Sequence, residues 1–454
     1  MNIKYNSKKI QKGDTFIALK TNNDGHKYIN DAIKNGATKV VAEYGSYPIE
    51  TLLVDNTKEY LVKYLYENYY QEIKDLKLIG ITGTNGKTTT CMLLHNMLNM
   101  LGRKTAYIGT NGFYINKFIK ELPNTTPEIL DIYELLIEAK REGCEFVCIE
   151  ASSHGLAQNR LENLKFDYAI FTNLTHEHLG YHKTMKNYAL AKQKLFTMLR
   201  NNKYAIINND DNYKNYFILK ENNNITYSLN NGNYYVKEYK ITTQNNIFTV
   251  VNNNKEYTFT TKLLGKHNIY NSLASIIVLN KIGYSFEEIN NVLTIVSGPK
   301  GRMENISYNN NNIIIDYAHT PDGIANILNT AKELHPNKII TIVGCGGGTG
   351  SDRTKRSEMG NLVLSLSDKT IFTNDNPRDE DPNQIINDLL KEKINNNYII
   401  ELDRKKAINK GINMLTNNDI LLILGKGHEN YQIIGNKKTH FNDKETVLEI
   451  TKEN

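Results

Sequence analysis

The stretch Gly83-Thr84-Asn85-Gly86-Lys87-Thr88-Thr89 decides how this chain folds. It lies between an apolar run at residues 76–81 and an amphipathic run at residues 90–101, which stops at Gly102. This order predicts a strand, a glycine loop and a helix. A glycine loop that leads into a helix presents backbone N–H groups and the positive end of the helix dipole to an anion. The sequence therefore predicts a phosphate-binding loop.

Two side chains of this loop suit a nucleotide. Lys87 can reach the terminal phosphates, and the hydroxyl of Thr88 can bind Mg²⁺. The generic nucleotide loop has a further glycine at the position of Ile81, so the loop is a variant. The alternative is a chance Gly-Lys-Thr sequence in a surface turn, which the flanking strand and helix disfavour.

Length and composition limit the classes of protein to which this chain can belong. The chain has 454 residues, too many for one hydrophobic core, which predicts two or three domains. The net charge is +6, and the sequence contains no long block of Lys or Arg, so we expect no nucleic-acid partner. No apolar run approaches a membrane span, and the N-terminus has no apolar signal segment. The spacing of the four cysteines fits neither a zinc site nor a redox motif, so we expect them to be buried, reduced thiols. They are Cys91, Cys144, Cys148 and Cys345. We expect a cytoplasmic monomer without membrane contact.

Strands alternate with helices along most of the chain, which predicts doubly wound, parallel α/β sheets. We expect a small α/β unit at residues 1–75, a central unit at 76–297 and a third α/β unit at 298–454. The run Ser297-Gly-Pro-Lys-Gly301 marks the second boundary, because Gly and Pro interrupt both neighbouring patterns. The expected elements are strands at 15–19, 39–42, 76–81, 146–149, 168–171, 313–316, 339–343, 370–372 and 420–424, a β-ribbon at 224–262, and helices at 28–35, 90–101, 127–142 and 267–282.

Polar residues follow two of the predicted central strands, at the strand ends where ligands collect in open α/β sheets. Glu150 ends one strand, and its carboxylate could hold Mg²⁺ directly or through water. After the strand at 168–171, residues 176–182 include three histidines and a glutamate. Such a run could suggest zinc, but no cysteine is near, and the spacing lies on a loop and not on a helix face.

The loop at residues 82–89 resembles the ATP loop of the Mur ligases and of the related folylpolyglutamate synthetases. Both families join an amino acid to a carboxylate at the expense of ATP. The run Glu150-Ala-Ser-Ser-His-Gly-Leu156 resembles the Mur ligases, especially the branch that adds the third residue of a peptide. The resemblance covers nearly the whole chain. It implies a small UDP-binding N-terminal α/β domain, a central P-loop domain with a doubly wound parallel sheet, and a Rossmann-like C-terminal α/β domain that binds the amino acid.

The resemblance also implies cofactors, substrates and residue roles. The implied partners are ATP, Mg²⁺, a UDP-N-acetylmuramoyl dipeptide and a diamino acid. Lys192, whose place is fixed by the run Tyr181-His182, would carry a carbamate formed with CO₂, and His178 would ligate a second magnesium ion, which we prefer to zinc. The implied catalytic residues are Lys87, His178, Lys192 and Arg302, and the implied metal ligands are Thr88, Glu150, His178 and Lys192 as its carbamate. The implied ATP-binding residues are Gly83, Thr84, Asn85, Gly86, Lys87, Thr88, Thr89, Asn268, Asn271, Arg302 and Asp316. The implied contacts to the UDP-muramoyl dipeptide are Ser7, Thr125, Thr126, Ser152, Gln158 and Arg160. Thr126 is also a candidate N-cap for the helix at 127–142.

The runs Asp375-Asn376-Pro377-Arg378 and Gly425-Lys-Gly-His-Glu429, together with Arg356, resemble the branch that adds meso-diaminopimelate. Asp375 and Asn376 can hold an ammonium group, and the two arginines offer forks for carboxylates. The implied amino-acid-binding residues are Arg356, Asp375, Asn376, Pro377, Arg378, Gly425 and Glu429. The expected activity is ATP-dependent addition of meso-diaminopimelate to UDP-N-acetylmuramoyl-L-alanyl-D-glutamate through an acyl phosphate, a step of peptidoglycan precursor synthesis.

The sequence departs from the family pattern in two places. The family usually has more residues ahead of an Asp-Ser-Arg run, whereas this chain begins close to Asn6-Ser7-Lys8, so we expect weaker binding of the uridine. Residues 347–351 lengthen the loop ahead of Asp352-Arg353. The alternatives are a ligase that adds L-lysine or meso-lanthionine, a folylpolyglutamate synthetase-like ligase, and a non-catalytic protein that binds muropeptide.

Overall fold

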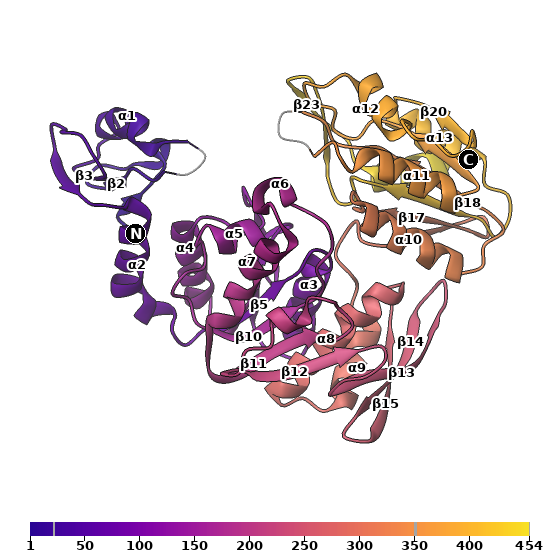
Figure 1. Ribbon diagram of the computed structural model, residues 1–454, viewed down its shortest axis with the longest axis horizontal. Helices are drawn as coiled ribbons and strands as arrows, with labels where there is room; N and C mark the ends of the chain where they lie inside the picture. Colours follow the sequence, from indigo (N-terminus) through magenta and orange to yellow (C-terminus); the bar gives the residue numbers. More distant parts are fainter. Residues whose placement is uncertain (21–22, 349–351, 454) are drawn as a thin grey trace.

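The computed structural model describes residues 1–20, 23–348 and 352–453. Figure 1 shows three lobes that follow one another along the chain, with the central lobe joining the other two. Each lobe has its own main sheet, so the predicted α/β class with three domains is confirmed. The boundaries near residues 75 and 297 stay a prediction, although each falls between two sheets. Within the described residues, no helix is both long and apolar enough to cross a membrane.

The N-terminal lobe is a small sheet of four strands, all paired in parallel in the order β1-β2-β3-β4. Its elements are β1 (Ile3–Lys4), β2 (Thr15–Ile17), α1 (Ile29–Lys34), β3 (Lys39–Ala42), β4 (Glu50–Leu53) and α2 (Thr57–Ile73). Ile29 and Ala32 of α1 are buried against the sheet residues Phe16 and Val40. The long helix α2 leads from this lobe to the central one.

The central lobe is built on one sheet of eleven strands. These are β5 (Lys77–Thr82), β6 (Thr105–Gly109), β7 (Gly112–Ile115), β8 (Lys117–Lys120), β9 (Phe146–Glu150), β10 (Phe166–Phe171), β11 (Leu199–Asn208), β12 (Asn223–Ser228), β13 (Tyr234–Ile241), β14 (Asn246–Asn252) and β15 (Lys255–Thr261). Their order is β15-β14-β13-β12-β11-β10-β5-β9-β6-β7-β8. The strand β5 lies between β9 and β10 and pairs in parallel with both. Their carboxyl ends therefore meet at a switch in strand order, the place where open α/β sheets bind ligands.

Helices cover both faces of this sheet. They are α3 (Lys87–Met100), α4 (Ile129–Arg141), α5 (Ser153–Ala157), α6 (Leu179–His182), α7 (Met185–Thr197), α8 (Lys266–Ile282) and α9 (Phe286–Ile295). The helices α3, α8 and α9 pack on the face that carries Ile79 and Ile81, and α4 and α7 pack on the face that carries Leu78. Because β5 is buried on both faces, it reads as a continuous apolar run in the sequence. The predicted ribbon at 224–262 is confirmed only in part: β13, β14 and β15 pair antiparallel, whereas β12, at the start of the range, pairs in parallel with β11 and β13.

Two predicted helix starts are wrong, and the first is that of the helix expected at 90–101, which begins at Lys87. The helix expected at 127–142 begins at Ile129, and Glu128 is its N-cap. The hydroxyl of Thr126 instead donates to Glu150 O at 2.7 Å and accepts from Ser152 N at 3.0 Å. Thr126 therefore joins the start of α4 to the end of β9, a tertiary role that competes with capping.

The C-terminal lobe carries a six-stranded sheet in the order β16-β17-β21-β18-β19-β20 and a separate two-stranded sheet. Its elements are β16 (Glu304–Tyr308), β17 (Asn311–Asp316), α10 (Pro321–Glu333), β18 (Ile339–Val343), α11 (Arg356–Leu366), β19 (Lys369–Phe372), α12 (Pro382–Leu389), β20 (Tyr398–Ile400), α13 (Arg404–Asn413), β21 (Ile420–Leu424), β22 (Tyr431–Ile434), β23 (Lys437–His440) and α14 (Asp443–Glu453). The helices α10, α11 and α12 cover one face of the larger sheet, and α13 and α14 cover the other. Residues 349–351 of the predicted loop extension lie outside the described residues.

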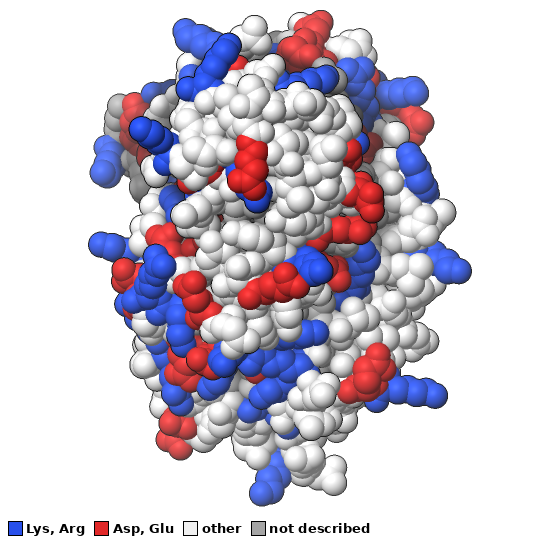
Figure 2. All heavy atoms as spheres, turned by 90° about the vertical axis from the view of Figure 1, so that its left-hand side faces the viewer, with Lys and Arg blue, Asp and Glu red and all other residues white. Residues whose placement is uncertain are grey.

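The surface charge is mixed. Figure 2 shows Lys and Arg interspersed with Asp and Glu on the side that carries the N-terminal lobe. Pairs such as Lys20 with Glu43 and Lys39 with Glu50 join opposite charges within the N-terminal lobe. The four cysteines are buried free thiols, as predicted.

Candidate active site

The phosphate-binding loop needs glycine at two positions. Gly83 has a φ of +150°, and a Cβ atom there would lie 1.9 Å from the hydroxyl oxygen of Thr172. Gly86 has a φ of +85°, and a Cβ atom there would lie 2.5 Å from Asn271 Oδ1. A side chain at either position would push the loop away from β10 or α8. The glycines therefore permit the path that leaves the first N–H groups of α3 available to an anion.

The end of β10 holds this loop in place. Thr84 N donates to Asn173 O at 2.8 Å, and Asn85 N donates to Asn173 Oδ1 at 2.9 Å. The hydroxyl of Thr172 donates to Asn85 O at 2.6 Å. These bonds fix the loop before any ligand binds, so its ordering costs little when a nucleotide arrives.

Two lysines converge on one backbone oxygen of the loop. Lys87 Nζ and Lys192 Nζ each donate to Gly83 O at 2.7 Å. Lys192 comes from α7, is 1% exposed, and places its Nζ 4.5 Å from the centre of the Tyr188 ring. Burial, and then the charge of Lys87, hold the pKa of Lys192 well below its ordinary range. This environment favours a neutral amine at position 192.

Glu150 is a fully buried carboxylate held by neutral donors. Its Oε1 accepts from the Tyr107 hydroxyl at 2.5 Å and from Thr110 N at 3.0 Å. Its Oε2 accepts from the Thr88 hydroxyl at 2.9 Å and from the Thr110 hydroxyl at 3.2 Å. Because Thr88 donates its proton to Glu150, the lone pairs of the Thr88 oxygen stay available to a cation. Tyr107 was not foreseen from the sequence, where it is one apolar-strand residue among several.

The histidine-rich run forms a cluster beside the loop. His178 has a left-handed φ of +57°, and its Nε2 lies 3.6 Å from Glu177 Oε2. Its ring centre lies 4.9 Å from that of His154. Burial lowers the pKa of His178 to about 4, so its ring is neutral and keeps a lone pair for a metal. Across residues 1–20, 23–348 and 352–453, no group of three or more His, Cys, Asp or Glu side chains is arranged to hold a metal.

A cavity of about 600 Å³ joins the loop to the C-terminal lobe. The predicted nucleotide residues line it from both sides: Gly86, Lys87, Thr88, Thr89, Asn268 and Asn271 from the central lobe, and Arg302 and Asp316 from the C-terminal lobe. Across it, Asn85 Nδ2 donates to Asp322 Oδ2 at 2.6 Å. The cavity is therefore a two-lobed site whose shape depends on how the lobes meet.

Arg302 and Asp316 line the C-terminal side of this cavity. The guanidinium carbon of Arg302 lies 4.8 Å from the centre of the Tyr317 ring, and its buried Nε has no hydrogen-bond partner in the described part of the chain. Asp316 accepts from Met303 N and Ala318 N, each at 2.7 Å. Burial raises the pKa of Asp316. The Nε of Arg302 can therefore donate to a ligand, whereas both oxygens of Asp316 already accept backbone hydrogen bonds.

The residues expected to hold the UDP-muramoyl dipeptide cluster where β9 meets α4. The hydroxyls of Thr125 and Thr110 lie 3.0 Å apart. Arg160 donates to Thr126 O at 2.8 Å and to Gln158 Oε1 at 2.6 Å. Ser152 lines the 600 Å³ cavity with Thr125. Ser7 is the exception, because it belongs to the N-terminal lobe (Figure 1).

The two runs expected to bind the amino acid meet at the carboxyl edge of the C-terminal sheet. Asn376 Nδ2 donates to Glu429 Oε2 at 2.8 Å. A Cβ atom on Gly425 would lie 2.5 Å from Asp375 Oδ2, so this glycine lets the loops touch. Lys426 was missed from the sequence although it lies within the second run. It is fully buried, and its Nζ lies 2.8 Å from Glu429 Oε2.

Arg378 has an unusual backbone that the structure supports. Its φ of +54° falls in the left-handed region, which a long side chain seldom adopts. Its N donates to Ile433 O at 3.1 Å, and its O accepts from Gly435 N at 2.6 Å. Its Nη1 donates to Gly347 O at 2.8 Å. The turn after Pro377 therefore aims this guanidinium across the loop that follows β18.

Arg356 is already paired within the C-terminal lobe, so its expected contact with the amino acid stays a prediction. Its side chain has no exposed surface, and its fork donates to both carboxylate oxygens of Glu380 at 2.7 and 2.9 Å. It also donates to Asp388 Oδ2 at 2.8 Å. A substrate carboxylate would have to displace one of these partners. The exposed arginine of this segment is Arg353, whose side chain is 59% exposed and lies 3.4 Å from Glu380.

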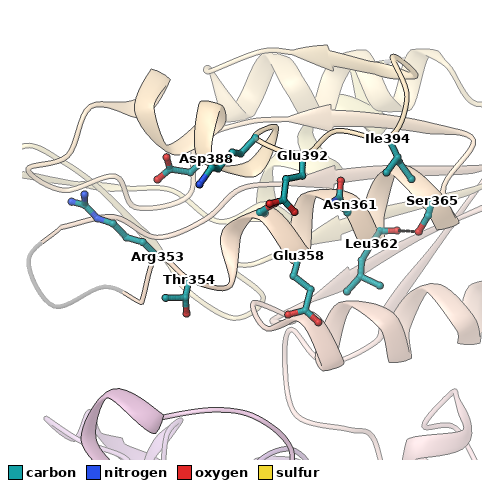
Figure 3. Close-up of a pocket in the computed structure, with 11 residues that line it drawn as sticks. Arg353, Thr354, Glu358, Asn361, Leu362, Ser365, Asp388, Glu392 and Ile394 are labelled. Carbon is teal, nitrogen blue, oxygen red and sulfur yellow. Dashed lines mark hydrogen bonds between the residues drawn. The ribbon is translucent and has the colours of Figure 1, made fainter. Parts of the chain in front are cut away.

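A hollow of about 830 Å³ lies over the outer side of α11, away from the phosphate-binding loop. Figure 3 shows Glu358, Asn361 and Leu362 along α11, with Asp388 and Glu392 above them. None of the residues expected to bind ATP, metal or substrate lines it. We therefore assign the chemistry to the smaller cavity, which contains the loop.

Comparison with known proteins identifies the family. Residues 81–279 match the Mur ligase middle domain, and residues 301–427 match the Mur ligase glutamate ligase domain. A Fusobacterium nucleatum protein named UDP-N-acetylmuramoyl-L-alanyl-D-glutamate--2,6-diaminopimelate ligase is 40% identical over 455 residues, covering 98% of this chain and 92% of that protein. A Clostridium perfringens protein of the same name is also 40% identical, covering 99% and 94%. A solved structure with this name has 31% identity and a TM-score of 0.70 over 99% of this chain and 94% of that one. The chain belongs to the Mur ligase family.

Proposed function

We propose that this chain is an ATP-dependent ligase that joins 2,6-diaminopimelate to UDP-N-acetylmuramoyl-L-alanyl-D-glutamate, forming ADP and phosphate in peptidoglycan precursor synthesis. The observation that carries the proposal is the near full-length likeness to ligases of that name. The two-lobed cavity around the phosphate-binding loop supports it, because residues of both lobes that we expect to bind the nucleotide line it together. The folylpolyglutamate alternative lacks comparable support.

The reaction needs little covalent participation by the protein. The γ-carboxylate of the D-glutamate residue attacks the γ-phosphorus of ATP, ADP leaves, and an acyl phosphate forms. The neutral amine of the amino acid then attacks the acyl carbon and loses one proton to water, and inorganic phosphate leaves with the C–O bond electrons. Lys87 neutralises charge on the transferring phosphoryl group, and Arg302 approaches it from the other lobe. Closure of the lobes keeps water from the acyl phosphate.

The oxygen donors beside the loop fit Mg²⁺. Thr88 and Glu150 offer a hydroxyl and a carboxylate, the hard ligands that Mg²⁺ prefers, and this ion commonly takes its remaining ligands from phosphates and water. When bound, Mg²⁺ would neutralise phosphate charge as a Lewis acid. His178 and a carbamate on Lys192 would hold a second ion.

The carbamate proposal follows from the state of Lys192. A neutral amine adds to CO₂, forms an N–C bond and releases one proton, which leaves an anionic oxygen ligand. The depressed pKa of Lys192 favours the reactive form. The product would also place an anion beside Lys87, which shares its hydrogen-bond acceptor.

The amino-acid site suits a substrate with two charged ends. Glu429, Asn376 and Asp375 offer oxygens to an ammonium group, and Arg378 offers a fork to the distal carboxylate. L-Lysine has no distal carboxylate and would set a second ammonium group against Arg378. Meso-lanthionine keeps both carboxylates and should be accepted.

Phosphate release tests the proposal. The assay would contain ATP, Mg²⁺, the UDP-muramoyl dipeptide and one diamino acid, with each component omitted in turn. We expect release that requires all components, with the rate for 2,6-diaminopimelate far above that for L-lysine. Release that needs no amino acid would indicate an ATPase. No release with any diamino acid would favour the non-catalytic muropeptide-binding alternative.

A further inference from the structure

A fully buried ion pair lies behind the proposed amino-acid site. Arg404, the first residue of α13, donates from Nε to Asp443 Oδ1 at 2.7 Å and from Nη2 to Asp443 Oδ2 at 2.8 Å. Both side chains have no exposed surface. Asp443 is the first residue of α14, so the forked pair ties the last helix of the chain to α13. Such a two-bond fork fixes orientation as well as distance.

The other bonds of Arg404 reach two backbone oxygens at the carboxyl edge of the sheet. Nη1 donates to Asn374 O at 3.3 Å, and Nη2 donates to Leu424 O at 3.0 Å. The first oxygen immediately precedes Asp375, and the second immediately precedes Gly425. Arg404 therefore binds the residue immediately before each run of the proposed site.

These two contacts span a strand. In the sheet, β18 lies between β19 and β21, so Arg404 joins the ends of two strands that do not pair with each other. The residue after β18 is Gly344, where a Cβ atom would lie 2.5 Å from Thr373 O and 2.8 Å from Asp375 N. The run after β19 thus passes close over the end of β18. The strands β19 and β21 share no ladder, so side chains link the two runs: the guanidinium joins them where they leave the sheet, and further along Asn376 donates to Glu429 and Lys426 donates to Asn376 Oδ1 at 3.3 Å.

Arg404 also compensates charge at the site. Asp375 is 7% exposed, and none of the salt bridges among the described residues includes it. Burial raises the pKa of Asp375, while the charges of Arg404 and Lys426 oppose that rise. Arg404 is thus one of two cations that face this carboxylate.

We propose that Arg404 is a positioning residue for the amino-acid substrate. Oriented by Asp443, its guanidinium sets the spacing between the run 375–378 and the run 425–429. It does not touch the substrate. This inference rests on the proposed function, which places the diamino acid between these runs. A site held even slightly too loosely loses binding, so the supporting bonds matter as much as the direct contacts.

The competing explanation is that the pair only stabilises the fold. Removing one member of a buried ion pair leaves an unpaired buried charge, whereas removing both for apolar groups is often neutral or stabilising. The variants Arg404→Leu and Asp443→Leu, alone and combined, separate the two explanations. Arg404→Lys keeps the charge without the fork. Lys406→Met, on the exposed side of the same helix, is the matched control.

The experiment measures KM for 2,6-diaminopimelate, ATP and the UDP-muramoyl dipeptide, together with the thermal unfolding midpoint. We expect the double variant to regain the midpoint that Arg404→Leu loses, yet to keep a KM for diaminopimelate raised about tenfold or more, which is a loss of uniform binding. KM for the other two substrates should stay within about twofold of wild type, as should every value for Lys406→Met. Arg404→Lys should also show the raised KM.

Two results would overturn the inference. One is a wild-type KM for diaminopimelate in the double variant, and the other is an equal rise in KM for all three substrates. If Arg404→Leu does not fold, the double variant, which removes both charges of the ion pair, still decides the question. A wild-type enzyme without diaminopimelate-dependent turnover would refute the proposed function itself, which is a different outcome.

Discussion

Lys87 and Lys192 donate to the same oxygen, Gly83 O, each at 2.7 Å. One lysine belongs to the start of α3 and the other to α7. Two ammonium groups on one acceptor would repel each other, and burial removes the water that would screen them, which favours the neutral amine at Lys192. A carbamate on Lys192 would turn this repulsion into attraction. The geometry therefore gives a physical reason for modification at Lys192, beyond its place in the family pattern.

Lys192→Ala should be nearly inactive, because it removes the anionic oxygen ligand proposed for the second metal ion. Added short carboxylates should restore part of the activity. Lys194→Ala is the matched control on the same helix, since Lys194 donates to Asn159 Oδ1 and lies outside the cavity. Carbon-13 NMR with labelled CO₂ should show a carbamate signal in wild type and in Lys194→Ala. An active wild-type preparation without that signal would contradict the proposal.

Lys87→Ala should lose on the order of a hundredfold or more in kcat, because a preorganised charge partner of the transition state is removed. Lys104→Ala, an exposed lysine in the same lobe, should change kcat little. Both are measured by phosphate release. Wild-type turnover in Lys87→Ala would remove this lysine from the catalytic group.

Arg378→Ala should collapse the preference for diaminopimelate over L-lysine. A site built for a polar group can reject an analogue lacking it by about four orders of magnitude, so the wild-type ratio of kcat/KM values should be at least about a thousandfold. The ratio should fall mainly through loss of activity with diaminopimelate. A ratio that survives the substitution would show that another group reads the distal carboxylate.

Arg356→Met should behave differently from Arg378→Ala, because Arg356 is already paired with Glu380 and Asp388. Breaking a buried ion pair costs about 3 kcal/mol or more. We expect a lower thermal midpoint with the diaminopimelate preference largely kept. Should the midpoint hold while the preference collapses, Arg356 would be a direct substrate contact, as the sequence resemblance implied.

Stability should fall in mild acid. His95 is 1% exposed, and burial lowers its pKa from 6.5 to about 4. Because its folded pKa is depressed, its contribution is complete above pH 6.5 and is lost as the pH falls towards 4, up to about 3 kcal/mol. His95→Gln should flatten the fall of the thermal midpoint over this range. His440→Gln, an exposed histidine, should leave the profile as in wild type.

Local patterns predicted much of the fold and site. The phosphate-binding loop, Glu150 and the run 375–378 follow strands whose apolar runs are plain in the sequence, so their meeting at strand ends could be expected. Pairings between distant residues could not. Arg404 meets Asp443, and Asn85 meets Asp322 across 237 positions, because the sheets bring them together. The pairing of Arg356 with Glu380 could not be predicted for the same reason, because the two residues are 24 positions apart in the sequence.

The most direct test of the central claim is a competition experiment with product analysis. The enzyme receives ATP, Mg²⁺, the UDP-muramoyl dipeptide, and equal concentrations of 2,6-diaminopimelate and L-lysine, and the products are weighed by mass spectrometry. We predict one new UDP-linked product, heavier than the dipeptide substrate by diaminopimelate less water, formed in step with one phosphate per molecule. A lysine-bearing product as the main species, or phosphate released without a new product, would contradict the account.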